Sequence, residues 1–250
     1  MGRFTISAIQ NVFHGLLDIL YPGHCFACNK NLHDEENPYV CKICLENIKG
    51  IGVKRCSKCG FTLAPGTFSS EKGCFECENS NLRFDRGFFV SDYEGPLKEL
   101  IHQYKYNKQE FLSKLLGDLS INHLLLQSIL HEIDIVVPVP LHWKKKLKRG
   151  FNQSDLIARR ISKELDIPIS GNNICRIKNT LSQTKLTRVQ RQINVSGAFR
   201  VKQPKVFSKK RALLVDDVLT TGITASECSR TLKKAGIRKV YLFALARAKH

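Results

Sequence analysis

Acidic residues are scarce in this chain. Its 22 Asp and Glu residues stand against 40 Lys and Arg residues, which gives a formal net charge of +18. Between Ile167 and Val215 there is no acidic residue at all, and eleven Lys or Arg lie from Arg176 to Arg211. A solvated surface is the ordinary explanation for any single run of lysines. The overall imbalance nevertheless makes polyanions, such as pyrophosphate, nucleotides or nucleic acid, the expected partners.

Long apolar runs are also missing. No segment reaches the roughly 18 uninterrupted apolar residues that a membrane-spanning helix needs. Apolar residues recur at helical spacing near the amino terminus, but Asn11, His14 and Asp18 interrupt them, and no small-residue cleavage site follows. We therefore interpret residues 1–22 as an amphipathic packing helix, with membrane-surface binding as the alternative. A cytoplasmic location is expected, with membrane association only through partners.

Cysteine, in contrast, is abundant and clustered. Eight of the ten cysteines form four C-x-x-C pairs: Cys25/Cys28, Cys41/Cys44, Cys56/Cys59 and Cys74/Cys77. A C-x-x-C turn brings two thiolates onto one tetrahedral ion, so residues 23–80 are predicted to form a double four-cysteine zinc ribbon with two structural zinc ions. We expect the first pair to share one ion with the second, and the third pair to share another with the fourth. Interleaved pairing and an iron–sulfur cluster are the alternatives, whereas disulfides are disfavoured in a reduced compartment.

The remainder of the chain alternates between strand-like and helix-like patterns. Strands are predicted at residues 87–93, 133–137, 212–215 and 239–246, and helices at 95–106, 110–126, 154–165 and 223–235. Residues 140–149 are expected to be a basic loop, and residues 178–198 have no clear periodicity. The alternation predicts an α/β domain over residues 81–250 with a mostly parallel sheet. Ligands of such sheets bind beyond the carboxyl ends of the strands.

Residues 212–224 contain the most informative motif. An apolar strand is expected to end at Val215, and the carboxylates of Asp216 and Asp217 follow it directly. Hydroxyls and free backbone N–H groups then open a helix, at Thr220, Thr221, Gly222 and Thr224. A helix N-terminus of this kind binds phosphate, while paired carboxylates suit sugar hydroxyls or a divalent metal. The alternative is an ordinary helix cap preceded by solvated acids.

This motif resembles the loop that binds phosphoribosyl pyrophosphate (PRPP) in type I phosphoribosyltransferases. The resemblance implies a type I phosphoribosyltransferase-like parallel sheet flanked by helices, with a small N-terminal zinc-ribbon module. It implies that Asp216 and Asp217 are the catalytic residues, which hold the ribose hydroxyls and Mg²⁺, and that the Thr/Gly turn holds the 5′-phosphate. Lys144, Lys148 and Arg149 lie in the segment that corresponds to the pyrophosphate loop.

The order of motifs along the chain resembles the ComF family, also called GntX, of phosphoribosyltransferase-like proteins associated with natural competence and DNA utilisation. After the double ribbon, the motifs lie at residues 92–97, 101–106, 137–142, 149–153, 180–199 and 212–224. The resemblance implies a DNA-uptake or DNA-utilisation protein that binds a PRPP-like ligand and single-stranded DNA, with DNA-uptake or recombination proteins as partners.

Two other functions remain open at the level of sequence. One is an active phosphoribosyltransferase that uses PRPP and Mg²⁺, although the sequence identifies neither a general base nor an acceptor pocket. The other is a zinc-ribbon scaffold for DNA-uptake or recombination proteins. Tyr104, Tyr106, Trp143 and Phe151 are candidates for base stacking, but packing is the commoner role for such aromatic residues.

Overall fold

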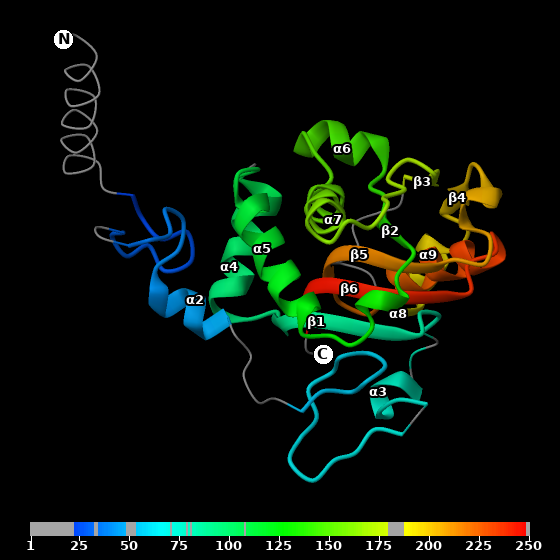
Figure 1. The fold of residues 1–250 in the computed structure, drawn as a ribbon, viewed down its shortest axis with the longest axis horizontal. Coiled ribbons are helices and arrows are strands. Elements are labelled where there is room, and N and C mark those ends of the chain that lie inside the picture. Colours follow the sequence, from blue (N-terminus) through cyan, green and yellow to red (C-terminus); the bar gives the residue numbers. More distant parts are fainter. Residues whose placement is uncertain are drawn as a thin grey trace.

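A parallel sheet flanked by helices forms the centre of the protein, and two cysteine-containing units lie beside it (Figure 1). The computed structural model describes residues 23–32, 35–48, 54–70, 72–78, 80, 82–107, 109–179 and 188–248. The helix predicted for residues 1–22 lies outside them. The predicted α/β fold with a parallel sheet and an N-terminal cysteine module is confirmed. Within the described ranges, no helix combines the length and the apolar content needed to cross a bilayer.

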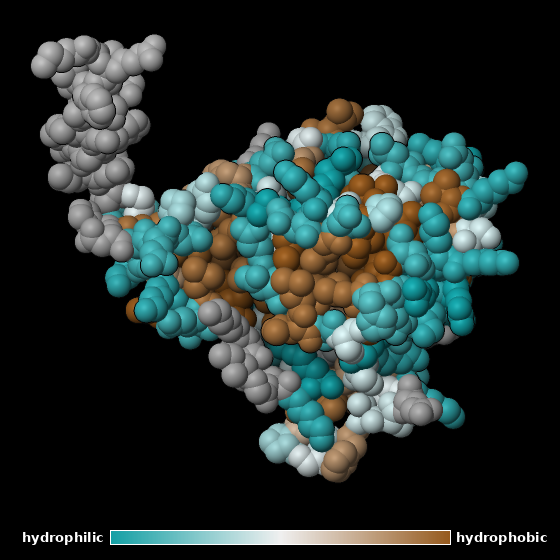
Figure 2. Space-filling view, viewed as in Figure 1, coloured by the Kyte–Doolittle hydropathy of each residue, from teal (hydrophilic) through white to brown (hydrophobic). Residues whose placement is uncertain are grey.

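The sheet has four strands, and each strand is parallel to its neighbours. Their order is β1 (Arg86–Asp92), β6 (Lys239–Arg247), β5 (Arg211–Leu219) and β2 (Ile135–Pro138). Helices α4 (Gly95–Tyr106), α5 (Leu112–Leu125) and α7 (Gln153–Glu164) cover one face, and α9 (Ile223–Lys234) covers the other. In Figure 2 apolar side chains gather over the middle of the molecule, where α5 and the sheet lie in Figure 1.

The central strand β5 carries apolar side chains on both of its faces because helices cover both sides of the sheet. Leu213 and Val215 belong to the core that contains α4, α5 and α7. Ala212 and Leu214 belong to the opposite core, which contains α9. A strand buried on both faces has no solvent-facing side, so an uninterrupted apolar run replaces the usual alternation of apolar and polar residues.

β5 continues beyond the point where the sequence predicted it to end. Its neighbour β2 stops with Pro138 opposite Val215, but β6 continues alongside and pairs Asp216 with Ala244. Pairing with β6 supplies backbone hydrogen bonds regardless of side-chain polarity, which is why the apolar pattern ended before the strand did. The acidic pair therefore lies on β5 itself, at a place where one side of the strand has no β2 partner.

Residues 140–149 also differ from the prediction, because Trp143–Arg149 form helix α6 instead of a loop. The Nδ1 atom of His142 accepts a hydrogen bond from the N–H of Lys144 at 3.3 Å, which caps the start of the helix. Gly150 ends it with a φ of 90°, in the left-handed region that favours glycine. The residues between are good helix formers. Trp143 and Leu147 are 60% and 75% exposed, and apolar atoms are visible over α6 in Figure 2.

A smaller layer lies beside α9. Strands β3 (Ile174–Arg176) and β4 (Phe199–Val201) form an antiparallel pair. They are accompanied by helix α8 (Arg188–Val195) and the short 3₁₀ helix η3 (Pro204–Phe207), and a second 3₁₀ helix, η1 (Leu130–Glu132), precedes β2. Helix α8 lies where the sequence showed no clear periodicity. The N–H of Gly197, just after α8, donates to the Glu227 carboxylate of α9 at 2.7 Å, so a distant helix holds this segment.

The two cysteine units attach at different places on the central domain (Figure 1). The first contains α2 (Lys42–Ile48), and the rings of Phe26 and Tyr39 lie 5.3 and 4.9 Å from that of Phe111, just before α5. The second contains α3 (Phe75–Glu78) and contacts the carboxyl end of β1 through side chains. There, Arg55 Nη1 lies 2.8 Å from the Asp92 carboxylate, which also accepts a hydrogen bond from Thr62 Oγ1 at 3.0 Å.

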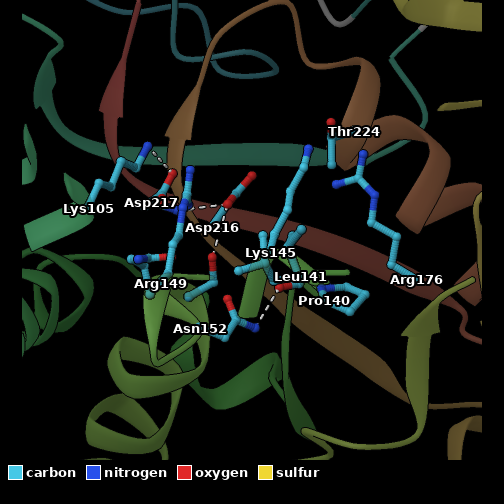
Figure 3. Close-up of a pocket in the computed structure, with 13 residues that line it drawn as sticks. Lys105, Pro140, Leu141, Lys145, Arg149, Asn152, Arg176, Asp216, Asp217 and Thr224 are labelled. Carbon is cyan, nitrogen blue, oxygen red and sulfur yellow. Dashed lines mark hydrogen bonds and ion pairs between the residues drawn. The ribbon is translucent and has the colours of Figure 1, made fainter. Parts of the chain in front are cut away.

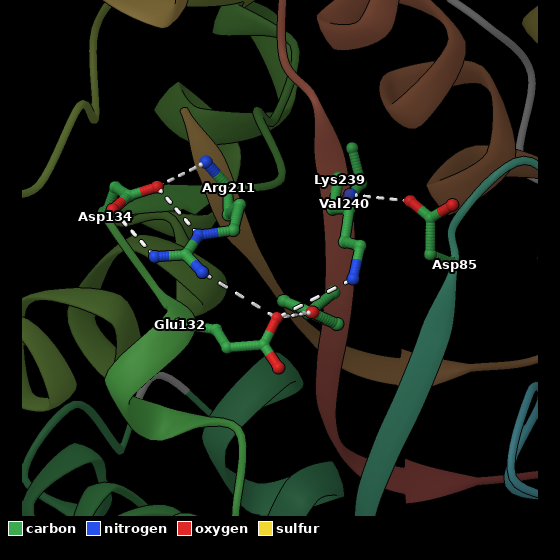
Figure 4. A network of polar contacts seen from close by, with 7 residues as sticks. Asp85, Glu132, Asp134, Arg211, Lys239 and Val240 are labelled. Atoms are coloured by element: carbon green, nitrogen blue, oxygen red, sulfur yellow. Dashed lines mark hydrogen bonds and ion pairs between the residues drawn. The ribbon is translucent and has the colours of Figure 1, made fainter. Parts of the chain in front are cut away.

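Ion pairs and hydrogen bonds connect the amino ends of the strands (Figure 4). Asp134, just before β2, accepts a hydrogen bond from the N–H of Arg211 at 2.7 Å and pairs with its guanidinium at 3.1 Å. The hydrogen bonds from Arg211 lower the pKa of the Asp134 carboxyl. Asp85, before β1, accepts from the N–H of Val240 at 2.7 Å. These contacts hold the edge of the sheet opposite the acidic pair.

Candidate ligand site and metal centres

A cavity of about 230 Å³ lies at the carboxyl edge of the sheet, beyond the end of β2 (Figure 3). The charged residues of its lining are Lys105, Lys145, Arg149, Arg176, Asp216 and Asp217. They come from α4, α6, β3 and β5, which are far apart in the sequence. Four cations against two carboxylates give the cavity a net positive charge, so it favours an anionic ligand.

Asp216 occupies the centre of the hydrogen-bonding at this site. Its Oδ1 atom accepts from the Ser154 hydroxyl at 3.0 Å and from the N–H of Asp217 at 2.9 Å. Burial raises the pKa of Asp216 to about 7, and the neighbouring Asp217 carboxylate contributes to the rise. A carboxyl group with this pKa is partly protonated near neutrality, and a cation bound beside it would favour the ionised form.

Asp217 forms an ion pair with Lys105, at 2.7 Å from the lysine Nζ (Figure 3). The two side chains are only 13% and 14% exposed. Burial opposes the charge on Lys105, but the Asp217 carboxylate outweighs this effect, and the pKa of the lysine is raised. Lys105 is a site residue that no sequence motif indicated. Nothing in the local pattern of α4 indicates that its last turn meets a strand more distant along the chain.

Only part of the predicted basic cluster reaches the cavity. Lys145 and Arg149, one helical turn apart on α6, line it, whereas Lys144 and Lys148 are exposed and lie outside the lining. Burial lowers the pKa of Lys145, and the nearby Arg176 and Arg149 add to the effect. In the described part of the chain no carboxylate forms an ion pair with Lys145. A bound anion would relieve this repulsion among cations.

The turn between β5 and α9 borders the same cavity. Thr224 is part of the lining, and in Figure 3 the ends of Lys145 and Arg176 extend to the side where Thr224 lies. Thr220, Thr221 and Gly222 lie in the turn itself, outside the lining. Gly222 precedes α9 with a φ of 75°, and a Cβ atom there would lie 2.7 Å from Leu82 Cδ2. Glycine is therefore required at the start of this helix.

Among the buried side-chain atoms of the described residues that lack a hydrogen-bond partner, two belong to neutral side chains near this turn and cavity. One is the Oγ1 atom of Thr221, and the other is the Nε2 atom of Gln153, a buried residue of the lining. The Oε1 atom of Gln153 is occupied, because it accepts from Arg149 Nη1 at 3.2 Å. Buried polar groups are nearly always paired in proteins, so these two atoms are candidates for contacts with a bound ligand.

The eight clustered cysteines form two groups of four sulfur atoms, and the sulfurs of each group lie within 4.8 Å of one another. The groups are Cys25, Cys28, Cys41 and Cys44, and Cys56, Cys59, Cys74 and Cys77. The sequential pairing predicted from the spacing is confirmed. Three of the sulfur–sulfur distances within these groups are 3.6 to 3.8 Å. Tetrahedral zinc with Zn–S bonds of about 2.3 Å separates its sulfurs by about 3.8 Å, whereas a disulfide would need about 2.05 Å. The residues therefore fit two structural metal ions.

Comparison with known proteins agrees with this arrangement. Residues 16–78 match the family model of the double zinc ribbon domain. The chain is 32% identical over 228 residues to competence protein F of Haemophilus influenzae, across 90% of this chain and 96% of the relative. The chain belongs to the ComF family. It is also 30% identical over 234 residues to DNA utilization protein YhgH of Escherichia coli K12, across 90% of this chain and 97% of that protein.

Solved structures similar to this ComF-family chain include two proteins of phosphoribosyl chemistry. One is the glutamine PRPP amidotransferase of Bacillus subtilis, with 19% identity and a TM-score of 0.36 over 53% of this chain and 25% of that chain. The other is a purine phosphoribosyltransferase of Pyrococcus horikoshii, with 17% identity and a TM-score of 0.36 over 54% of this chain and 84% of that chain.

The fold of this ComF-family protein also separates the four aromatic candidates for base stacking. Tyr104 and Phe151 are buried in the core, where their rings lie 5.3 Å apart. The hydroxyl of Tyr104 donates to the carbonyl of Gln153 at 3.0 Å, which is a structural contact. Tyr106 and Trp143 are exposed. Packing therefore accounts for two of the four candidates, and two stay accessible to a ligand.

Proposed function

We propose that this protein binds a phosphorylated ribose, PRPP or a similar phosphosugar, and does so in DNA uptake or DNA utilisation. A single observation carries the proposal: one cavity joins the Asp216 and Asp217 carboxylates, the cations Lys145 and Arg149, and the N-terminal turn of α9. Carboxylates accept hydrogen bonds from sugar hydroxyls, while cations and helix N-termini bind phosphate. The biological context is supported by the names of the relatives, which describe competence and DNA utilisation.

The same donor set suits Mg²⁺, which prefers oxygen ligands and usually binds through one or two carboxylates together with substrate phosphates. Asp216 and Asp217 would hold the ion jointly with the ligand. A bound Mg²⁺ would neutralise diphosphate charge, and the residues of this chain would orient the sugar and bind its 5′-phosphate. Ser154 would keep the Asp216 carboxyl in place through the hydrogen bond that it already donates.

Calorimetric titration with PRPP and Mg²⁺ tests the proposal. The double variant Asp216→Asn/Asp217→Asn should bind at least about 100-fold more weakly than the wild type, because two charged acceptors are lost. Asp118→Asn is a matched control, since Asp118 pairs with Arg160 on the helical layer, away from the cavity lining. Equal affinity of the wild type and the double variant would contradict the assignment of the site.

The same proteins distinguish binding from catalysis and from a scaffold function. Release of pyrophosphate from PRPP in the presence of an acceptor would identify an active phosphoribosyltransferase. Full complementation of a deletion strain by the Asp216→Asn/Asp217→Asn variant would instead identify a scaffold that works without the ligand. We expect neither result: the ligand should bind without turnover, and the variant should fail to complement.

Single-stranded DNA binding is a second candidate function, which the exposed surface of α6 favours. Trp143 and Leu147 are accessible there, and Lys144 and Lys148 are exposed on the same helix. Lys144 Nζ lies 5.4 Å from the centroid of the Trp143 ring. Proteins that bind single strands without sequence preference combine basic grooves with aromatic side chains on which bases stack. This combination lies directly beside the proposed phosphosugar site.

We expect the two sides of α6 to bind different ligands, single-stranded DNA on the exposed side and the phosphosugar on the side that faces the cavity. Lys144→Gln/Lys148→Gln should weaken binding of an oligothymidylate and lower the slope of log affinity against log salt by about 1.4, at about 0.7 per phosphate contact. The same variant should leave PRPP affinity unchanged. The matched variant Lys145→Gln/Arg149→Gln should weaken PRPP binding. Calorimetry measures PRPP affinity, and fluorescence anisotropy measures oligothymidylate affinity. Equal effects of the two variants on PRPP affinity would contradict the assignment of different ligands to the two sides of α6.

A further inference from the structure

Arg247, the last residue of β6, holds the backbone where the turn of the proposed phosphate site begins. Its side chain is buried, at 5% exposure. Its Nη1 atom donates to the carbonyls of Thr220 at 2.6 Å and Leu219 at 3.3 Å, and to that of Ala248 at 2.6 Å. Leu219 ends β5, and Thr220 is the first residue of the turn that leads into α9. One guanidinium group therefore sets the path of the chain into this turn.

The other neighbour of Arg247 is the second cysteine unit. The guanidinium carbon lies 5.9 Å from the centroid of the Phe61 ring, which packs against the second group of four cysteines. Burial lowers the pKa of Arg247, and the charges of Cys59, Glu76 and Cys74 act against this effect. Throughout the described ranges, no carboxylate lies within ion-pair distance of Arg247. The negative charges that act on this buried cation therefore come from the second cysteine unit.

The charge of that cluster depends on its metal. A zinc ion held by four thiolates has a formal net charge of about −2, whereas four protonated thiols have none. A buried guanidinium is costly without a compensating charge, and attraction over a short distance is strong where water is excluded. Metal binding at the second cluster would therefore stabilise Arg247 in the position from which it donates to the carbonyls of Leu219 and Thr220.

A second contact joins the same unit to the turn. The chain that leaves the second cysteine unit places Leu82 against Gly222, so closely that a Cβ atom there would overlap with the leucine. The N–H of Arg83 then lies 3.3 Å from the Ser226 hydroxyl, in the first turn of α9. The first cysteine unit is different, because its aromatic contacts are with Phe111, near α5. The two metal sites are thus unequal in their relation to the ligand site.

We propose that Arg247 is a positioning residue that couples metal binding at the second cysteine cluster to phosphate affinity at the turn between β5 and α9. The proposal rests on the function proposed above for that turn. Loss of the second metal ion leaves Arg247 without its counter-charge, the turn loses its preferred path, and phosphate binds more weakly. Loss of the first metal ion has no such effect.

Matched pairs of cysteine variants test the coupling in the full chain. Cys59→Ser/Cys74→Ser removes the second metal site, and Cys28→Ser/Cys41→Ser removes the first. Each variant should retain one of the two metal ions, measured by atomic emission. Calorimetry with ribose 5-phosphate should show a Kd increase of about tenfold for the second-site variant alone, within the usual range for coupled sites. Equal weakening by both variants, or by neither, would overturn the proposal.

Arg247 variants keep the test valid if the cysteine variants fold poorly. Arg247→Met should retain both metal ions and still lose about tenfold in ribose 5-phosphate affinity, and Arg247→Lys should restore part of it because it keeps the charge. Hydrogen exchange at residues 219–224 should be faster in Arg247→Met than in the wild type. Adding Arg247→Met to the second-site cysteine variant should weaken binding no further, since both changes break one pathway. Additive effects would reject the coupling.

The proposed function and the coupling fail in different ways. If the wild-type protein does not bind ribose 5-phosphate, the proposed phosphosugar site is wrong and the coupling is rejected with it. If the wild type binds ribose 5-phosphate and Arg247→Met binds it equally well, only the coupling is rejected.

Discussion

Removing metal from both cysteine clusters should unfold the second cysteine unit and leave the parallel-sheet domain folded. The second unit has almost no apolar core of its own: its buried cluster consists of the four cysteines, with Phe61, Leu63 and Leu82 packed against them. Structural zinc contributes about 10–16 kcal/mol of apparent binding free energy in zinc-finger peptides at neutral pH, and in such modules this is the free energy of folding. The central sheet, in contrast, has a large core on each face.

Hydrogen exchange with a strong chelator measures this effect. Amides of residues 54–78 should exchange at the rate of an unfolded chain after chelation, whereas those of β5 and β6 should stay protected. Adding zinc back should restore protection, which controls for irreversible oxidation. Cobalt substitution should produce the visible absorption of tetrahedral thiolate sites. Unchanged protection of residues 54–78 in the chelated protein would show that the metal is not structural, and an iron-derived colour in the purified protein would identify a cluster in place of zinc.

Breaking the ion pair between Lys105 and Asp217 should produce the second large effect. Asp217→Ala leaves the Lys105 ammonium buried without its partner, and removing one member of such a pair typically lowers the free energy of unfolding by about 3 kcal/mol or more. The pKa of Lys105 is raised in the folded state. Its charge therefore stabilises the fold at neutral pH, and this contribution is lost only as the pH rises through the raised pKa.

Urea unfolding at neutral pH provides the measurement. The double variant Lys105→Met/Asp217→Leu should recover much of the stability lost in Asp217→Ala, because no charge is left buried alone. Arg159→Ala is a matched control: Arg159 forms an ion pair with Asp155 at 2.8 Å but its side chain is 55% exposed, so its loss should change stability by less than about 1 kcal/mol. If Asp217→Ala is no less stable than Arg159→Ala, the pair is not the buried contact described above.

Much of this protein can be predicted from the sequence where the relevant residues are close along the chain. The C-x-x-C pairs predicted metal sites because a short turn determines where two thiolates point, and the spacing between successive pairs predicted their sequential pairing. The order of apolar strands and amphipathic helices predicted the parallel sheet. The turn from Asp216 to Thr224 was recognisable because carboxylates, hydroxyls and a glycine follow one another within a few residues.

Tertiary structure alone determined which distant groups meet at the site. Lys105 and Ser154 reach the acidic pair and Arg176 lines the same cavity, from three separate elements whose local patterns do not indicate it. The helical form of α6 decided that Lys145 and Arg149 face the cavity while the neighbouring lysines face solvent. Spacing within a turn follows from covalent geometry and hydrogen bonding, which the local sequence specifies. Contact between remote side chains depends on how whole helices and strands pack, and that is a property of the folded chain.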